Sequence, residues 1–200
     1  MVWLLICFIG SGASGLIYEV AWVRSLELVF GSTTFAVATV LAAFMGGLAG
    51  GSFFMGKMSH RFRRFHPLAV YGVIELLIAV VALMVPWLLR AMIPLYQWVW
   101  GSFHASFVLF SVIRLLLSAA ILLLPTLLMG ATLPIVSDFA GRDAEHGQKR
   151  IGMLYAFNTL GAVLGCGAAG VFLFPATGLA KTQWVAVALN VAAAAGAFVL

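Results

Sequence analysis

Five ionisable side chains stand inside long apolar stretches of the sequence: Glu19, Arg24, Glu27, Glu75 and Arg114. An ionisable residue within a membrane-spanning helix is costly and usually faces a partner or a water-filled cavity. Arg24 and Glu27 are three residues apart, so they can pair along one helix face near the membrane interface. The other three are the candidates for an ion pair or a cation site inside the protein.

Glu19 and Arg114 are predicted to lie at the same depth. Glu19 stands three residues after Leu16, the centre of the first apolar stretch, and Arg114 three residues before Leu117, the centre of the fourth. If the two stretches cross a membrane in opposite directions, both side chains lie roughly 4–5 Å to the outer side of the midplane. A lone arginine at the bilayer centre costs at least about 2.5 kcal/mol. The sequence therefore predicts an ion pair between them.

Two roles for this pair remain open at this stage. The pair holds the helices together, or a bound cation competes with Arg114 for Glu19 at a site beside Tyr18 and Trp22. Two roles are also open for Glu75, which lies close to the middle of the third stretch. It is a structural acid that is protonated or hydrogen-bonded, or it binds a proton or a cation. The predicted ligand-binding residues are therefore Glu19, Arg114, Glu75, Tyr18 and Trp22.

The composition places these residues in a membrane protein. Of the 200 residues, 64% are hydrophobic and 8% are charged, whereas a soluble domain carries about 25% charged residues. A bilayer core is about 30 Å thick, and a helix of roughly 20 apolar residues crosses it. The predicted fold class is an all-α integral membrane protein. The net charge of +5 is interpreted as a topology signal, and no nucleic-acid partner is expected.

Six apolar stretches are long enough to cross a bilayer. They cover about residues 2–29, 34–55, 68–89, 106–128, 151–174 and 182–200. The first is interpreted as a true membrane helix because no lysine or arginine precedes its apolar part, as a signal peptide requires. Its glycine-rich patch, residues 10–15, is expected to tilt or bend the helix. Residues 90–105 are rich in tryptophan and tyrosine, which prefer the membrane interface. They are predicted to form an outer loop, with or without a short helix along the membrane surface.

Positive charge gathers in two short loops. Seven of the eleven basic residues lie there: Lys57, Arg61, Arg63, Arg64, Arg142, Lys149 and Arg150. Basic loops tend to stay on the cytoplasmic side of a membrane. Both termini are therefore predicted to be cytoplasmic, in a membrane such as the bacterial inner membrane, with the lipid bilayer as the first partner.

The second apolar stretch is predicted to pack closely on another helix. Gly46 and Gly50, and likewise Gly47 and Gly51, are four residues apart and so share a helix face. Glycine at this spacing lets a second backbone approach closely in a membrane. The alternative is an anchor helix that faces only lipid.

An internal repeat relates the second stretch to the fifth. A shift of 120 residues lays residues 35–54 over residues 155–174 with seven identical pairs, such as Thr39 with Thr159 and Gly50 with Gly170. The two stretches are predicted to cross in opposite directions, which is typical of the inverted three-plus-three repeat nested in each half of major facilitator transporters. The sequence then forms one six-helix domain, residues 1–200, with repeats at about 1–89 and 106–200. Chance matching of small residues is the alternative.

No catalytic, cofactor or metal motif occurs in the sequence. Cys7 and Cys166 lie in apolar stretches and have neither disulfide nor metal spacing. The four histidines lie in predicted loops and also lack metal-ligand spacing. There is no glycine-rich turn between a strand and a helix that could hold a cofactor. We expect no cofactor, no metal and no catalytic residue in this chain.

Polar residues elsewhere in the apolar stretches are expected to serve packing. Asn158 and Thr159 can hydrogen-bond between helices, and this is favoured over contact with a ligand. Pro125 and Pro134 flank a Met-Gly-Ala-Thr segment. A broken helix between them could line a binding cavity, or the prolines could simply kink the helix; the sequence leaves both open.

Three stretches together resemble one protein family. They run from Ser11 to Ser52, from Leu123 to Phe139 and from Leu154 to Leu179, and they contain the pieces GLIYEVAW, MGATLP and YAFNTLGAVLG. They are similar to the membrane part of fused major-facilitator/spermidine-synthase-like proteins. The stretch 56–64 also looks like the transporter loop between helices two and three. It has His60 where that loop usually has an aspartate, and it lacks the glycine before the final basic pair.

The resemblance implies a membrane domain that anchors a cytosolic aminopropyltransferase-like domain and handles its polyamine ligand. The site for decarboxylated S-adenosylmethionine would belong to that second domain, which nothing in this sequence matches, so the chain alone is expected to be inactive as an enzyme. The alternative function is a half-transporter that moves a small cation after pairing with a second six-helix unit. A homo-oligomer is a further possible partner arrangement.

Overall fold

The apolar stretches form helices because a helix satisfies its own backbone hydrogen bonds, as any segment in hydrocarbon must. The computed structural model describes residues 1–31, 33–58, 61, 64–103, 107–141 and 146–200. This part of the chain is helical and contains no strand, which confirms the all-α prediction. His60, Arg63 and Arg142, which carry part of the sequence-based predictions, lie outside the described residues.

Six α-helices and one short π-helical segment follow one another along the described chain. They are α1 (Val2–Phe30), α2 (Thr33–Met58), α3 (Pro67–Phe103), α4 (Phe107–Ala140), α5 (Gly147–Ala168), η2 (Ala169–Leu173) and α6 (Phe174–Val199). α1 ends where Gly31 takes the left-handed conformation, with φ 66° and ψ 15°. Glycine is the usual residue for such a helix end because it has no Cβ to clash.

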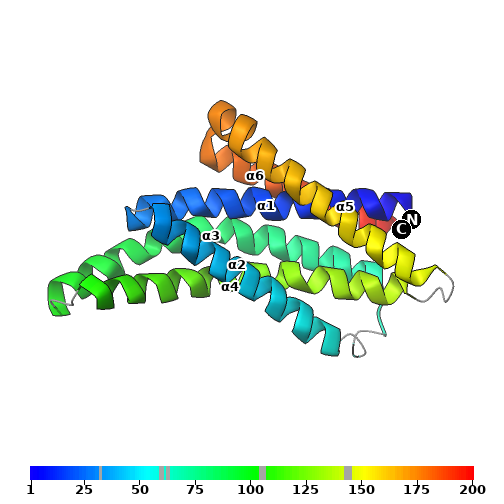
Figure 1. Cartoon of the computed structure of the whole chain (residues 1–200), viewed down its shortest axis with the longest axis horizontal. Coiled ribbons are helices and arrows are strands. Elements are labelled where there is room, and N and C mark those ends of the chain that lie inside the picture. The colour runs from blue at the N-terminus through cyan, green and yellow to red at the C-terminus, as the bar shows by residue number, and fades with distance from the viewer. Residues whose placement is uncertain (32, 59–60, 62–63, 104–106, 142–145) are drawn as a thin grey trace.

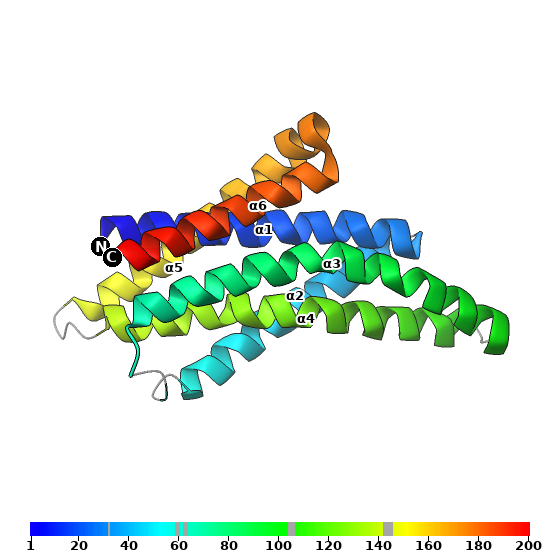
Figure 2. The ribbon, with the colours of Figure 1, turned by 180° about the vertical axis from the view of Figure 1, so that it is seen from behind.

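Five helical stretches in the described chain are long and apolar enough to cross a membrane, as expected for an integral membrane protein. The sequence predicted six separate stretches, but α5, η2 and α6 form one continuous stretch, Gly147–Val199. Within it Gly178 has φ 76° and ψ 175°, a conformation that is essentially restricted to glycine. Figures 1 and 2 show the chain doubling back between α5 and α6.

The predicted outer loop at residues 90–105 is wrong for most of its length. α3 continues as helix to Phe103, through both Pro86 and Pro94. Proline is tolerated in membrane helices because neighbouring side chains and small local adjustments satisfy the freed backbone groups. The aromatic residues that suggested a loop therefore extend α3 instead of ending it.

Two segments that the sequence marks as irregular are helical in the structure. α1 is continuous α-helix through its glycine patch, so the patch does not interrupt it. α4 is assigned as α-helix over its whole length, with Pro125 and Pro134 inside it. The broken helix considered for this segment is therefore not formed.

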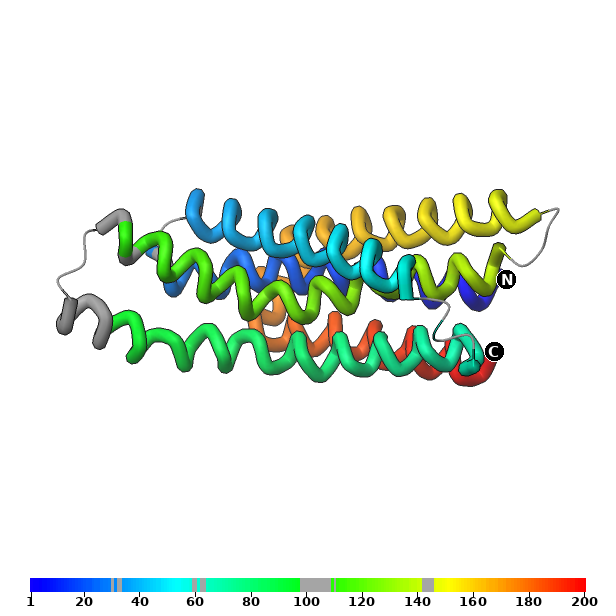
Figure 3. The backbone as a smooth tube through the Cα atoms, turned by 90° about the horizontal axis from the view of Figure 1, so that it is seen from below, coloured from blue at the N-terminus to red at the C-terminus, as the bar shows by residue number. Residues whose placement is uncertain are grey.

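The ends of the helices gather in two groups. Figures 1 and 2 place both chain termini at one end of the molecule, together with the end of α2, the start of α3, the end of α4 and the start of α5. Figure 3 shows the same grouping from below. The described basic residues Lys57, Arg61, Arg64, Lys149 and Arg150 belong to these chain segments, so positive charge is concentrated at that end.

Two helix pairs form the closest contacts, α1 with α5 and α2 with α4. In the first pair, a Cβ added to Gly12 would collide with the backbone of Asn158, and one added to Gly161 would collide with the carbonyl of Ile9. Small residues allow such close approach, and van der Waals packing drives helix association in lipid. The glycine patch of α1 is thus a packing surface.

The α2–α4 pair is built in the same way. A Cβ on Gly51 would collide with the carbonyl of Leu127, and one on Gly130 would collide with the carbonyl of Leu48. Gly46, on another face of α2, has open space around it. The predicted close packing of α2 is confirmed for one of its glycine faces.

α3 completes the bundle by packing on α4 and on α6, which in turn packs on α1. One face of α3 is buried at intervals of three or four residues: Tyr71, Glu75, Ile78, Ala82, Val85 and Leu89. This spacing is that of a continuous seam between helices. Glu75 occupies a position in the seam where an apolar residue would be expected.

The close contact at Gly51 predicts a specific loss of stability. Gly51→Ala should lower the free energy of unfolding in detergent by about 1–3 kcal/mol, because the added methyl group forces the α2 and α4 backbones apart. Unfolding by sodium dodecyl sulfate in mixed micelles, followed by circular dichroism, measures this quantity. Gly46→Ala is the matched control on the same helix and should be neutral or slightly stabilising. Equal stability of the two variants would contradict the assigned packing.

Candidate functional site

The carboxyl of Glu75 is fully buried, with no exposed surface, and it has defined hydrogen-bond partners. Ser11 on α1 donates a hydrogen bond from Oγ to Glu75 Oε1 at 2.5 Å. Asn190 on α6 donates from Nδ2 to Oε2. The carboxyl group therefore lies where α1, α3 and α6 meet, and each of the three helices contributes one polar residue.

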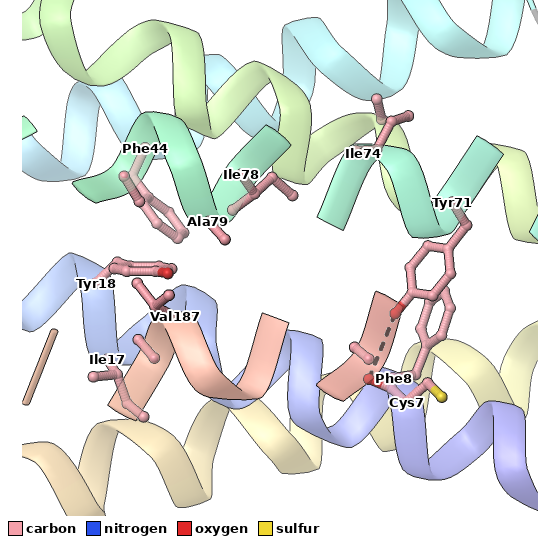
Figure 4. Close-up of a cluster of buried hydrophobic side chains, with 14 of the residues drawn as sticks. Cys7, Phe8, Ile17, Tyr18, Phe44, Tyr71, Ile74, Ile78, Ala79 and Val187 are labelled. Atoms are coloured by element: carbon pink, nitrogen blue, oxygen red, sulfur yellow. Dashed lines mark hydrogen bonds between the residues drawn. The ribbon is translucent and has the colours of Figure 1, made fainter. Parts of the chain in front are cut away.

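Aromatic side chains close this polar cluster on one side. Tyr71, one turn before Glu75 on α3, interacts with the Glu75 side chain. Its hydroxyl also donates to the carbonyl oxygen of Cys7 at 3.5 Å. Its ring stacks on that of Phe8, with ring centres 5.3 Å apart. Figure 4 shows this arrangement and its dashed hydrogen bond.

A cavity of about 300 Å³ lies next to the cluster, with walls from α1, α2, α4, α5 and α6. Its polar lining residues are Ser11, Ser52, Thr132, Tyr155, Asn158 and Asn190. The remaining lining residues are apolar or glycine. A concave, mostly apolar site with a few converging polar groups is the usual form of a small-ligand pocket, and this volume is at the low end of the range.

Two of the cavity residues also hold helices together. Asn158 donates from Nδ2 to the carbonyl of Phe8 on α1 at 3.3 Å, which confirms its predicted interhelical role. Ser52 donates to the carbonyl of Gly130 on α4 at 2.8 Å. Thr159, expected to act like Asn158, instead donates to Tyr155 in its own helix and is exposed.

The structure does not bring Glu19 and Arg114 together. Among the described residues the hydrogen-bonded ion pair is the one between Arg24 and Glu27, at 3.0 Å. Glu19 is partly buried, and Arg114 lies over the ring of Tyr96, 5.5 Å from its centre. The depth argument failed because α1 packs mainly on α5 and α6 whereas α4 packs mainly on α2 and α3. Equal depth does not make two helices neighbours.

Tyr18 and Trp22, predicted to flank a cation at Glu19, are fully buried in the core. Their rings stack with centres 5.6 Å apart. Figure 4 draws Tyr18 in one cluster of buried side chains with Val187 of α6 and Ala79 of α3. The Tyr18 hydroxyl and the Trp22 indole nitrogen have no hydrogen-bond partner in the described chain. These two rings are part of the packed seam and not of the cavity wall.

A second cavity, of about 720 Å³, lies among α1, α3 and α6 near the opposite end of the molecule. It is lined by Ser25, Arg90, Trp87 and Trp184 together with apolar residues. Gln183 also lines it, but its amide nitrogen is already used in a 2.6 Å hydrogen bond to the carbonyl of Ala82. Ser25 likewise donates to a backbone carbonyl, that of Ala21, and no carboxylate is among the described residues that line this cavity.

Sequence reasoning missed Ser11 and Asn190. Both are short neutral residues inside apolar stretches, and such residues occur in most membrane helices as packing groups. Glu75 was found because a buried acid is rare in a membrane helix. The seam spacing of α3 was a signal that Glu75 faces the core, but no pattern in the sequence identifies which residues of other helices meet it.

The chemistry that this cluster supports directly is binding and proton transfer. Within the described residues no three His, Cys, Asp or Glu side chains come together as a metal site would require. A carboxyl with neutral hydrogen-bonding neighbours can hold a proton or a cation. Comparisons of the chain with protein-family models, with curated proteins and with solved structures found no match. Functional inference therefore rests on the residues themselves.

The separation of Glu19 from Arg114 predicts additive effects on stability. Glu19→Gln and Arg114→Gln should each change the free energy of unfolding in detergent, and the double variant should show their sum within about 0.5 kcal/mol. Denaturation of the three variants in parallel gives the coupling energy. A coupling above about 1 kcal/mol would restore the predicted ion pair. Arg24→Gln and Glu27→Gln provide a reference cycle for a pair that does form.

Proposed function

We propose that the chain is a six-helix membrane domain of the kind found in fused major-facilitator/spermidine-synthase-like proteins. The proposal takes α1–α3 and α4–α6 as two repeats of opposite orientation. The proposed function of this domain is to hold a small organic cation, such as a polyamine, in the cavity beside Glu75. The domain also anchors a partner domain at the basic end. The observation that carries the proposal is the cavity itself, since its wall includes Ser11 and Asn190, which bond a buried carboxyl.

The glycine contacts favour the repeat. Gly12 of α1 meets the backbone of Asn158 as Gly130 of α4 meets that of Leu48. Gly161 of α5 meets Ile9 as Gly51 of α2 meets Leu127. In both sets of contacts, equivalent residues of α1 and α4 are 118 positions apart in the sequence, and those of α2 and α5 are 110 apart. The identical residues had suggested a shift of 120. Equivalent contacts at a constant offset are expected of an inverted repeat.

The continuous stretch Gly147–Val199 is proposed to cross the membrane twice, reversing near Gly178. Its 53 residues would form a straight helix of roughly 80 Å, far more than the 30 Å hydrocarbon core. The glycine conformation at Gly178 and the doubling back in Figure 2 agree with a reversal. With six crossings, both termini and the basic residues share the cytoplasmic side.

Cysteine labelling tests this topology. In a background of Cys7→Ala and Cys166→Ala, Ala180→Cys should react with a membrane-impermeant maleimide added outside intact cells, because residue 180 follows the proposed outer reversal. Lys149→Cys, also exposed but at the basic end, should react only after the membrane is permeabilised. Reporter fusions after Arg64 and Arg150 should behave as cytoplasmic. Labelling of both cysteines from the same side would overturn the six-crossing topology.

Ligand binding tests the proposed function. Purified chain in detergent should bind spermidine or putrescine, and Ala49→Trp should weaken binding by at least about tenfold, or about 1.4 kcal/mol, because residue 49 lines the cavity. Gly46→Trp is the control on the same helix, since Gly46 has open space around it and lies outside the cavity lining. Isothermal titration calorimetry measures both. Absence of polyamine binding by the native chain would overturn the cation-holding role.

A second function, a half-transporter for a small cation, is favoured by the same cavity and repeat. It requires a second six-helix unit to enclose the cation pathway. Uptake of labelled spermidine into proteoliposomes would support transport, whereas binding without uptake would support the anchoring role.

A further inference from the structure

The carboxyl of Glu75 has no counter-charge among the described residues. Its carboxyl is fully buried, and no ion pair to a lysine, arginine or histidine is formed by it among the described residues. An ionised carboxylate without a counter-charge in a low-dielectric interior costs several kcal/mol. The neighbours Ser11 and Asn190 are neutral. They can stabilise either form of the carboxyl, because each carries both a donor and an acceptor.

Asn190 shows where a second state of the cluster would be found. Its Nδ2 donates to Glu75, but its Oδ1 is buried and has no hydrogen-bond partner in the described chain. If the amide turns by half a rotation, Oδ1 faces Glu75 and needs a donor there. Only the protonated carboxyl supplies that donor. Each protonation state of Glu75 thus matches one orientation of the Asn190 amide.

The cavity gives this cluster access to water. Its volume of about 300 Å³ has room for about ten water molecules at roughly 30 Å³ each. Ser11 and Asn190 both line it and both bond Glu75. A proton can therefore pass from hydronium in the cavity to the Ser11 hydroxyl while that hydroxyl passes its own proton to Glu75 Oε1. The hydronium becomes water, and the carboxylate becomes a neutral acid.

We propose that Glu75 is a reversible proton-binding site, and that the side-chain amide of Asn190, at the cavity wall, turns when Glu75 gains or loses its proton. In the ionised state the amide nitrogen of Asn190 faces Glu75. In the protonated state the amide oxygen accepts the new proton and the amide nitrogen turns away from the carboxyl. The side chain of Asn190, which lines the cavity, thus has one amide orientation for each protonation state of Glu75. This site needs no polyamine, so it stands or falls separately from the proposed function.

The other titratable groups near Glu75 do not share its chemistry. α1 contributes Cys7 and Tyr18, and α3 itself contributes Tyr71, all within electrostatic range of the carboxyl. Thiols and phenols stay neutral at and below pH 7. Glu19 on α1 is only partly buried and has no hydrogen bond to this cluster among the described residues.

The helices on either side of α3 bring no formal charge to Glu75. α6 contributes the neutral amide of Asn190, while Lys181 lies at its exposed far end. On α4, Arg114 lies over Tyr96, roughly 30 Å along α3 from Glu75. Asp138 adjoins Phe139, whose ring contacts His66 just before α3 begins. A titration seen near neutral pH in this cluster therefore belongs to Glu75.

Infrared difference spectroscopy of the full chain in lipid nanodiscs tests the proposal. A carbonyl band of a protonated carboxylic acid should be present at low pH, disappear as the pH is raised, and be missing from Glu75→Gln. Asn190→Leu should move the midpoint of this titration to higher pH by about one to two units. The reason is that the lost hydrogen bond to the ionised carboxylate was worth more than one to the neutral acid.

Gln183→Leu is the matched control, because Gln183 is also a buried amide on α6 but donates to a backbone carbonyl of α3. It should leave the midpoint unchanged. If Glu75→Gln does not fold, the native band and its shift in Asn190→Leu still decide the question. A band that persists at every pH the protein tolerates, or that never forms, would overturn the proposal. A midpoint that Asn190→Leu does not move would also overturn it. So would a carbonyl band whose intensity follows the sodium concentration instead of the pH.

Spermidine binding measured on the same samples separates the two proposals. A native titration with no spermidine binding contradicts only the proposed function. Spermidine binding with no titration of Glu75 contradicts only the proton site.

Discussion

The bundle depends on the close approach of two pairs of helix backbones. α1 meets α5, and α2 meets α4, at glycines where even one methyl group would collide with a carbonyl of the partner. In lipid there is little hydrophobic gain in bringing two apolar helices together, so contact between backbones supplies much of the attraction. These contacts also fix the rotation of each helix, and with it the direction in which every other side chain of that helix points.

The polar cluster follows from this rotation. With Gly12 turned toward α5, Ser11 is left to face α3 and the cavity. α6 packs on both α1 and α3, which brings Asn190 to the other oxygen of Glu75. A carboxyl in the middle of an apolar seam would be strongly unfavourable alone. Neutral donors from two further helices make it tolerable, and both of these donors also line the cavity.

The contrast between Glu75 and Arg114 shows what a polar residue in a membrane helix does and does not reveal. Both were identified from the sequence because of their cost in hydrocarbon. Glu75 lies in the core and its neighbours come from α1 and α6, whereas Arg114 lies near the N-terminal end of α4 against Tyr96. The cost predicts that each residue must have favourable surroundings. It does not predict which helix provides them.

Several properties were determined by the sequence alone, namely the helical class, the membrane-spanning length of the stretches and the close packing of α2. Each depends on composition or spacing within one segment: apolar length, absence of charge, and glycines four residues apart. The continuation of α3 to Phe103 was misjudged because interfacial aromatic residues and prolines are compatible with both a loop and a helix end. The sequence also placed a gap between the fifth and sixth stretches, because Pro175 and Gly178 are typical of a helix end; in the structure both lie inside α6.

Only the tertiary structure decided which residues meet. Ser11 and Asn190 are 179 residues apart, and they reach one carboxyl because three helices pack with one particular rotation. The same packing separated Glu19 from Arg114 despite their equal predicted depth. Depth in a membrane is a property of a single helix and can be counted along the sequence. Neighbourhood is set by the contacts of all the helices together, and these depend on side-chain shapes that no single segment records.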